Sequence, residues 1–199
     1  EIVFGQTFSY KGEEFAISLA GVYQKENAVL ALNALEELDR LGWTTTMEQR
    51  KDGLLHTSWK GRFTVINKKP LFIVDGAHNA GAADKMAESV RHYFNGKKLI
   101  YIMGVFADKE YKIVLEKTAH FAEKIYTIET PDNPRALPAE ELAKAARVYN
   151  SSAESTKSIK DAVEKAFSCA GDDENSAILA FGSLSFIGAL TNAVEEYVG

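Results

Sequence analysis

Beyond residue 70, short apolar runs alternate with segments in which apolar residues recur at the spacing of a helix. The runs have the length and composition of buried strands. Because parallel strands need helical crossovers, this alternation predicts an α/β domain with a largely parallel sheet and helices on both faces. The predicted elements are strands Leu71–Val74, Leu99–Gly104, Lys124–Ile128 and Ala177–Phe181, and helices Ala80–Phe94, Lys109–Ala122, Pro138–Tyr149, Ser158–Cys169 and Phe186–Tyr197.

The beginning of the chain follows a different pattern. Residues Ile2–Leu19 carry β-branched and aromatic residues on either side of Lys11-Gly12, which predicts a β-hairpin. An amphipathic helix is predicted over Val22–Leu41 and a shorter helix over Thr46–His56. These elements make too small a unit to stand alone, so we interpret residues 1–58 as the tail of a preceding domain. The apolar stripe that predicts the first helix consists of Leu30, Ala34, Leu38 and Leu41.

The pattern changes after Trp59-Lys60-Gly61-Arg62. Two short strands are predicted there, Phe63–Ile66 and Leu71–Val74, joined by Asn67-Lys68-Lys69-Pro70. We therefore expect a second domain over residues 59–199, with no repeat and no low-complexity linker inside it.

Composition narrows the class of protein. The chain has 199 residues, 46% of them hydrophobic and 26% charged, which is enough for one sizeable core and part of a second. A net charge of −5 without clustered Lys and Arg argues against a nucleic-acid partner. The single cysteine, Cys169, excludes an intrachain disulfide, and no apolar run is long enough to span a membrane, so we expect a cytoplasmic protein. Because Glu1 is not an initiator Met, we also expect a fragment of a longer protein.

Polar residues follow four of the predicted strands at their carboxyl ends. Ligands bind outside these ends in open α/β sheets, because the loops of neighbouring strands meet there. Such loops are polar in most proteins, so each one alone is explained without a ligand, but His, Lys, Arg and Ser together on one rim favour a binding site. These residues are Asp75, His78, Asn79, Asp108, Lys109, Thr130, Asp132, Arg135, Gly182, Ser183 and Ser185.

The turn from Gly76 to Gly81 has the G-x-x-x-x-G spacing of a phosphate-binding loop. Ala82 and Ala83 stand where that loop needs Lys and then Ser or Thr, so the turn can offer backbone N–H groups to an anion but cannot hydrolyse a nucleotide by itself. The G-x-G-x-x-G fingerprint of a dinucleotide-binding oxidoreductase is absent here too. An N-cap network explains Asp75 and Asn79 about as well as a functional role does.

The four histidines show no zinc-binding spacing, and neither H-E-x-x-H nor paired cysteines occur. We interpret His56, His92 and His120 as helix-surface residues. His78 differs because it lies at a predicted helix start, where its imidazole can face a ligand. No motif of a serine or cysteine nucleophile is present, which argues against a covalent hydrolase.

Six segments resemble the folylpolyglutamate synthases, which in many bacteria are also dihydrofolate synthases. In chain order they read "LAGVYQKENAVLALNALEEL", "WKGRF", "VDGAHNAGAA", "GVFADKEY", "PRALPAEEL" and "FGSLSFIG". The combination is specific although each piece alone is not. These enzymes belong to the Mur-ligase superfamily, so the resemblance implies a Rossmann-like C-terminal domain that binds the amino acid, preceded by the last part of the central ATPase domain.

The resemblance implies ATP-dependent amide formation. A carboxylate is phosphorylated to an acyl phosphate, which the amine of glutamate attacks, and the anionic intermediates need positioned cations and donors. ATP, Mg²⁺, L-glutamate and a folate or dihydropteroate are the implied cofactors and substrates, and a monomer is expected. In this family the phosphate loop and the magnesium ligands lie upstream, so no metal ligand is expected here and the fragment should not turn over ATP alone.

Site residues are carried over by position. Asn27 resembles the adenine-contacting Asn, Arg62 the Arg that reaches the nucleotide phosphates, and Asp75 the carboxylate that holds the ribose. His78 lies near the phosphate and glutamate pocket by the same likeness and is the catalytic candidate. Replacing Asp75 or Arg62 by Ala is expected to slow acyl-phosphate formation without unfolding the domain. The candidates for binding glutamate are Ser183, Lys109 and Arg135.

Two alternatives stay open. Asp132 to Arg135, "DNPR", also resembles the diaminopimelate-adding muramyl ligases, although those usually have Tyr where this chain has Gly76. A stand-alone ligand-binding domain without catalysis is the other alternative. The family often has Tyr where this chain has Ser185, so no role of an aromatic ring is carried over to that position.

Overall fold

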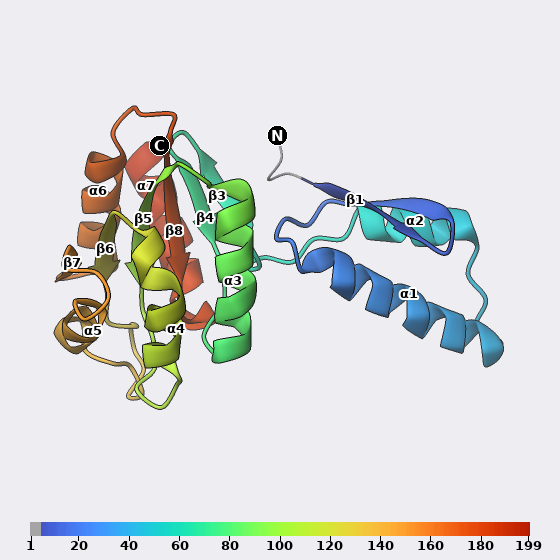
Figure 1. Ribbon diagram of the computed structural model, residues 1–199, viewed down its shortest axis with the longest axis horizontal. Helices are drawn as coiled ribbons and strands as arrows, with labels where there is room; N and C mark the ends of the chain where they lie inside the picture. Colours follow the sequence, from blue (N-terminus) through green and yellow to red (C-terminus); the bar gives the residue numbers. More distant parts are fainter. Residues whose placement is uncertain (1–4) are drawn as a thin grey trace.

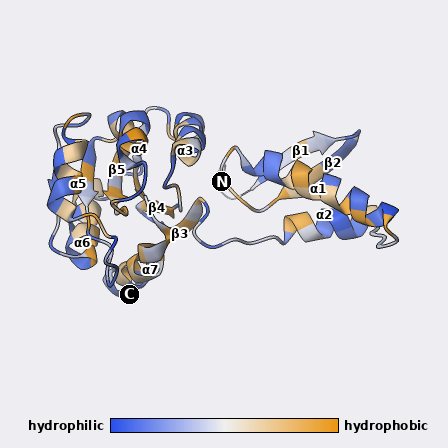
Figure 2. Cartoon of the chain, turned by 90° about the horizontal axis from the view of Figure 1, so that it is seen from below, coloured by the Kyte–Doolittle hydropathy of each residue, from blue (hydrophilic) through white to orange (hydrophobic). Residues whose placement is uncertain are grey.

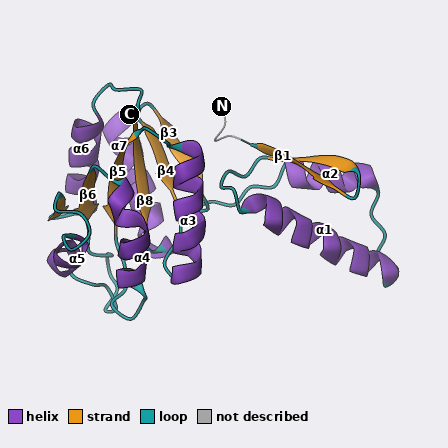
Figure 3. Ribbon diagram, viewed as in Figure 1, coloured by secondary structure: helices purple, strands orange, loops and turns teal. Residues whose placement is uncertain are grey.

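The computed structural model describes residues 5–199, which form two parts joined by an irregular segment at residues 56–63 (Figure 1). The smaller part comes first in the chain and holds a two-stranded sheet with two helices beside it. The larger part holds a six-stranded sheet between layers of helices (Figure 3). None of the described helices has the length and apolar character that a membrane span requires.

The small sheet confirms the predicted hairpin over the residues that the structure describes. Strands β1 (Gln6–Tyr10) and β2 (Glu13–Ile17) pair antiparallel. Lys11 and Gly12 both have positive φ, 50° and 85°, which is the backbone of a turn whose twist matches the strands. Residues 2–4 of the predicted hairpin lie outside the described residues.

Helix α1 (Gln24–Arg40) is confirmed, but the predicted apolar stripe does not face the core. Leu30 and Leu41 are 68% and 75% exposed. The buried residues are instead Gln24, Ala28 and Leu32. Both sets have helical spacing of three or four residues, so periodicity predicts the helix correctly yet cannot tell which side packs against the hairpin. The stripe therefore predicts the helix but does not mark its buried side.

Helix α2 (Met47–Leu55) confirms the second helix of the small part and starts in a capping box. The Thr46 side chain accepts from the Gln49 backbone N–H, and the Gln49 side chain accepts from the Thr46 N–H. Figure 2, which colours the chain by hydropathy, shows α1 and α2 beside the hairpin and away from the larger part. The small part thus meets the larger one at the start of α1.

The large sheet has the strand order β3-β4-β8-β5-β6-β7. Only the edge strand β3 is antiparallel to its neighbour, and the other four pairings are parallel. Strand β7 was not predicted, because three residues at a sheet edge give no apolar run. The bounds are β3 Thr64–Lys68, β4 Leu71–Val74, β5 Lys98–Met103, β6 Lys124–Thr127, β7 Ala153–Ser155 and β8 Ser176–Phe181.

Helices cover both faces of this sheet, which confirms the predicted α/β fold. Along β5, Tyr101 and Met103 belong to one buried cluster and Ile100 and Ile102 to the other, as the period of two in a strand requires. The first cluster lies under α3, α4 and α5, and the second under α6 and α7. The bounds are α3 Ala80–Tyr93, α4 Tyr111–Thr118, α5 Ala139–Ala146, α6 Ile159–Ala170 and α7 Ile187–Val198, with 3₁₀ turns at Ala119–Phe121 and Leu184–Phe186.

Candidate functional site

The turn between β4 and α3, residues 75–79, lies where the two parts of the chain meet. The Asp75 N–H donates to the Ala180 carbonyl and continues the β4–β8 ladder, while the Gly76 N–H donates to the Gly61 carbonyl in the joining segment. Asn79 caps α3, because its side chain accepts from the Ala82 N–H. The turn is therefore held from both sides by backbone hydrogen bonds.

Asp75 is a buried carboxylate at this junction, 4% exposed. Its Oδ2 accepts from the Tyr23 hydroxyl at 2.9 Å and from the Phe63 N–H at 2.8 Å, and its Oδ1 accepts from the Ala77 N–H at 2.7 Å. Burial raises the pKa of this carboxyl above its usual range, and the three hydrogen bonds oppose the rise. Burial, together with the charge of Asp75, also raises the pKa of the Tyr23 phenol.

Through these hydrogen bonds, Asp75 connects the smaller and the larger part of the chain. Tyr23 comes from the small part, and Phe63 has a φ of 45°, a conformation that a bulky residue adopts only when its surroundings hold it. The predicted contact of Asp75 with a ribose stays a prediction, since both carboxylate oxygens already accept hydrogen bonds from the protein.

Tyr23→Phe should lower the free energy of unfolding by about 1.5–3 kcal/mol where Asp75 is ionised, because the lost hydrogen bond then reaches a charged group, and by only about 0.5–1.5 kcal/mol at lower pH, where Asp75 is protonated. With a raised pKa, the folded state holds the Asp75 proton more tightly than the unfolded chain, so stability falls as pH rises from about 3.9 through the folded-state pKa. Removing the Tyr23 hydroxyl raises that pKa further. Urea unfolding at several pH values measures the effect.

The matched control is Tyr149→Phe, because the Tyr149 hydroxyl has no hydrogen-bond partner among residues 5–199. This change should leave stability within about 0.5 kcal/mol at every pH. A Tyr23→Phe loss of the same size across the whole pH range of the folded protein would contradict the coupling to Asp75.

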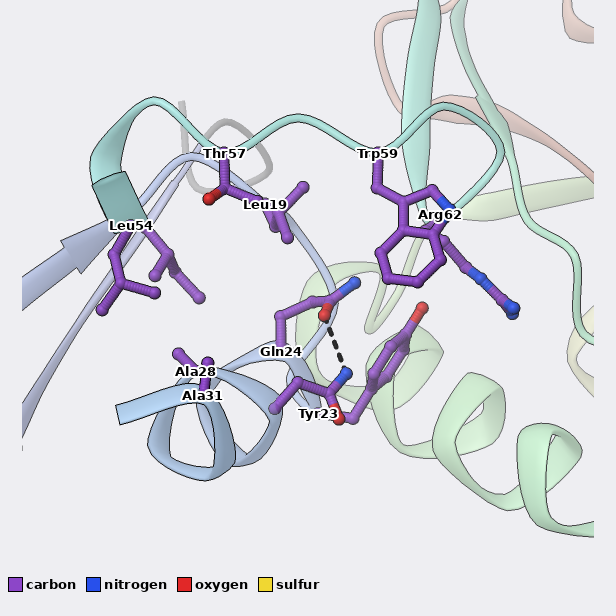
Figure 4. A pocket seen from close by; sticks show the side chains of 11 residues that line it. Leu19, Tyr23, Gln24, Ala28, Ala31, Leu54, Thr57, Trp59 and Arg62 are labelled. Carbon is purple, nitrogen blue, oxygen red and sulfur yellow. Dashed lines mark hydrogen bonds between the residues drawn. The ribbon is translucent and has the colours of Figure 1, made fainter. Parts of the chain in front are cut away.

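A first cavity, of about 390 Å³, opens between α1, β2, α2 and the joining segment (Figure 4). Its walls are mostly apolar, with Ala28 and Ala31 on one side and Leu19 and Leu54 on the other. Polar groups come from residues at the start of α1 and from the joining segment. The remaining lining residues are Ile17, Tyr23, Gln24, Asn27, Thr57, Trp59 and Arg62.

Two predicted nucleotide-binding residues, Asn27 and Arg62, thus line one cavity. The Arg62 guanidinium lies 5.7 Å from the centre of the Trp59 ring. Within residues 5–199 it has no ion-pair partner, so its donors are available to an anion. The sequence did not indicate that Trp59 and Tyr23 line this cavity, because the cavity forms only when α1 packs beside the joining segment.

A second cavity, of about 320 Å³, lies at the carboxyl ends of β5 and β8. It brings together His78, Lys109, Arg135 and Ser183, four residues predicted from sequence. Its other lining residues are Phe106, Gly182, Leu184 and Ser185. The prediction that polar residues after neighbouring parallel strands share one rim is confirmed at this cavity.

Arg135 is held in place by the loop after β5. Its Nη2 lies 2.5 Å from Asp108 Oδ2, its Nε lies 3.1 Å from Asp108 Oδ1, and its Cζ lies 4.8 Å from the centre of the Phe106 ring. The backbones of the two loops pair as well, since Ala107 N–H donates to the Arg135 carbonyl and Leu137 N–H to the Val105 carbonyl. Arg135 lowers the pKa of Asp108, so the negative charge of Asp108 already has a positively charged partner.

The other polar groups of the second cavity are available to a ligand. The Lys109 ammonium has no hydrogen-bond or ion-pair partner in the part of the chain that the structure describes. His78 Nδ1 lies 2.7 Å from the Gly76 carbonyl, so Nδ1 carries the proton and Nε2 is left for a ligand. Ser183 Oγ lies 2.7 Å from Ser185 Oγ, which orients the predicted glutamate-binding hydroxyl.

No metal site is found among the described residues. No group of three or more His, Cys, Asp and Glu side chains at positions 5–199 is arranged to hold an ion. The cations of the second cavity, not carboxylates, set its charge. The lining of the second cavity therefore suits an anionic ligand.

The chain is similar in sequence to two folate ligases. It is 29% identical over 189 residues to the dihydrofolate synthase/folylpolyglutamate synthase of Bacillus subtilis (strain 168), which covers 92% of this chain and 43% of that protein. It is 28% identical over 141 residues to the folylpolyglutamate synthase of Lacticaseibacillus casei, covering 68% and 33%. The chain thus spans less than half the length of these relatives.

Solved structures agree with the fold. Folylpolyglutamate synthase from Thermotoga maritima matches with a TM-score of 0.72 at 26% identity, over 92% of this chain and 41% of that one. The Mycobacterium tuberculosis enzyme complexed with ADP matches with a TM-score of 0.79 at 22% identity, over 95% of this chain and 46% of that one.

Residues 61–184 match the family described as "Mur ligase, glutamate ligase domain". Because this match covers more than half of its residues, the chain belongs to the Mur ligase family, with residues 61–184 in the glutamate ligase domain.

Proposed function

We propose that the chain is the C-terminal part of an ATP-dependent ligase that adds L-glutamate to a folate, and that it also accepts dihydropteroate. Residues 1–58 would form the C-terminal end of the central ATPase domain, and residues 59–199 would form the domain that binds glutamate. The γ-phosphoryl group of ATP passes to a carboxylate, giving an acyl phosphate and ADP. The glutamate amine then attacks the acyl carbon and inorganic phosphate leaves.

The observation that carries this proposal is the convergence of His78, Lys109, Arg135 and Ser183 on one cavity. Lys109 suits one carboxylate of glutamate, and Arg135 can reach the other through Nη1, because its pair with Asp108 uses Nε and Nη2. Ser183 offers a hydroxyl whose position Ser185 fixes. His78, with Nδ1 held by the Gly76 carbonyl, presents Nε2 to the reacting groups.

The nucleotide would occupy the first cavity, with Asn27 at the base and Arg62 at the phosphates. We propose that Mg²⁺ accompanies the nucleotide and neutralises part of its phosphate charge. The described residues offer no carboxylate cluster for the ion, so its ligands would come from the central domain. The complete enzyme is proposed to be a cytoplasmic monomer.

The charge of the second cavity weighs against the muramyl alternative. Diaminopimelate carries a second ammonium group, which needs an unmatched carboxylate in the pocket. The carboxylates of Asp108 and Glu110 flank the lining residue Lys109. Arg135 pairs with both oxygens of Asp108, and Glu110 accepts from the Ala80 N–H. An amino acid with an acidic side chain fits this arrangement better.

The test is an assay of the full-length ligase with ATP, Mg²⁺ and glutamate. We expect ADP release only when a reduced folate or dihydropteroate is added, and mass spectrometry should show the product heavier by one glutamate. Release only with a muramyl peptide would overturn the proposal in favour of cell-wall synthesis. Nucleotide binding without turnover on any of these substrates would favour the non-catalytic domain.

A further inference from the structure

Leu184 is a half-exposed apolar side chain in the wall of the second cavity. It begins the 3₁₀ turn that follows β8, and 45% of it is exposed. The other apolar side chain of the lining, Phe106, lies against the Arg135 guanidinium. Leu184 is therefore the apolar group of this cavity that is left to contact a ligand.

Two glycines leave the space that the Leu184 side chain fills. A Cβ atom added to Gly76 would lie 2.5 Å from Leu184 Cδ2 and 2.6 Å from Leu184 Cγ, and one added to Gly61 would lie 2.9 Å from Leu184 Cδ2. Carbon atoms that are not bonded pack at about 3.5–4.0 Å. Leu184 can therefore lie in this place only while neither position has a side chain.

The lack of a side chain at Gly76 is required by space and not by the backbone. Gly61 has a φ of 78°, a conformation that favours glycine whatever its neighbours are. Gly76 is not among the glycines with positive φ, so another residue can adopt its backbone. The atoms that exclude a side chain at Gly76 belong to Leu184. Gly76 thus determines where this wall of the second cavity stands.

An apolar wall beside two cations suits one class of ligand. An amino dicarboxylate has two carboxylates joined by a chain that includes methylene groups. Lys109 and Arg135 suit the carboxylates, and the methylene groups gain free energy when an apolar surface such as that of Leu184 covers them. Because the cations fix both ends of the ligand, the room beside Leu184 limits how many methylene groups fit between them.

We propose that Leu184 is a specificity residue of the second cavity, which lies against Gly61 and Gly76, contacts the methylene groups of the amino acid and sets the length of side chain that is accepted. The inference rests on the proposed function, because it assumes that glutamate occupies this cavity. It adds the residue that selects glutamate over its longer homologue, and the glycine of the turn that keeps this residue in place.

The first test places a methyl group at position 76 of the full-length ligase and follows steady-state ligation. In Gly76→Ala, Leu184 is displaced away from both glycines and into the cavity, so the KM for glutamate should rise about 10-fold while the KM for ATP stays within about 2-fold of wild type. Adding Leu184→Ala to Gly76→Ala removes the clash. The double variant should then have the same KM for glutamate as Leu184→Ala alone.

The second test leaves Gly76 unchanged and compares glutamate with 2-aminoadipate, which is longer by one methylene group. In the wild-type enzyme, we expect kcat/KM to be about 10–100-fold higher for glutamate. Leu184→Ala enlarges the cavity and should reduce this ratio about 10-fold. This measurement decides the proposal even if Gly76→Ala does not fold.

Gly188→Ala is the matched control, because Gly188 is an exposed glycine of α7 outside the cavity lining. It does not have a positive φ, and a Cβ atom added to it would have no atom within 4 Å. Both KM values should stay within about 2-fold of wild type.

Three results would overturn the inference and leave the ligase function standing. They are an unchanged KM for glutamate in folded Gly76→Ala, a KM that stays raised above that of Leu184→Ala in the double variant, and an unchanged ratio of glutamate to 2-aminoadipate in Leu184→Ala. Absence of ligation of glutamate by the wild-type enzyme contradicts the proposed function itself.

Discussion

Replacing Asp75 with Ala should lower the free energy of unfolding by about 3–5 kcal/mol, which is a large part of the stability of a domain. The substitution leaves the buried N–H groups of Phe63 and Ala77 and the Tyr23 hydroxyl without their acceptor. Phe63 would also lose the contact that holds its positive φ. Urea unfolding at pH 7, followed by circular dichroism, measures the loss.

This expectation revises the view from sequence that Asp75→Ala would slow the reaction without unfolding the domain. Asn79→Ala is the control in the same turn, because Asn79 is exposed and caps α3 through one hydrogen bond. It should cost only about 1 kcal/mol. If Asp75→Ala had the same free energy of unfolding as Asn79→Ala, the Asp75 carboxylate would not connect the two parts of the chain.

Replacing Arg62 with Ala should lower kcat/KM for ATP by about 10²–10³-fold in the full-length ligase and change stability by less than about 0.5 kcal/mol. The guanidinium lines the first cavity beside Trp59 and has no ion-pair partner among the described residues. Its removal therefore takes charge from the ligand, and from the fold only the attraction by which Arg62 lowers the pKa of Asp75 without forming an ion pair. Rapid-quench measurement of acyl-phosphate formation separates this loss from slow product release.

Arg62→Lys is the matched control for charge. It keeps the positive charge but not the planar fork that binds two phosphate oxygens at once, so it should recover only part of the rate. Full recovery would mean that charge alone matters. Unchanged rates in Arg62→Ala would remove the assignment of the first cavity to the nucleotide.

The large sheet could be predicted because its central strands are continuous apolar runs. Strands β4, β5, β6 and β8 were found in this way, and the rule that ligands gather at their carboxyl ends placed His78 and Ser183 correctly at one cavity. Strand β7 was not predicted, because it is too short to show an apolar pattern. The residues after parallel strands are predictable since the topology, not the side chains, brings them together.

The first cavity was less predictable because packing creates it. The buried side of α1 carries Gln24, which no hydrophobicity pattern would select, together with Ala28 and Leu32. Asn27 and Arg62 were found only through resemblance to a family. The burial of Asp75 was also missed, since an acidic residue in a turn is normally expected at the surface.

The turn at residues 75–79 contributes to both cavities, and this limits how the protein can evolve. Asp75 holds Tyr23, a wall of the first cavity, while His78 lines the second, so this turn connects the two cavities. The loops that carry Lys109 and Arg135 line only the second cavity. Related proteins that bind another ligand in the second cavity are therefore expected to differ in those loops and to keep the turn.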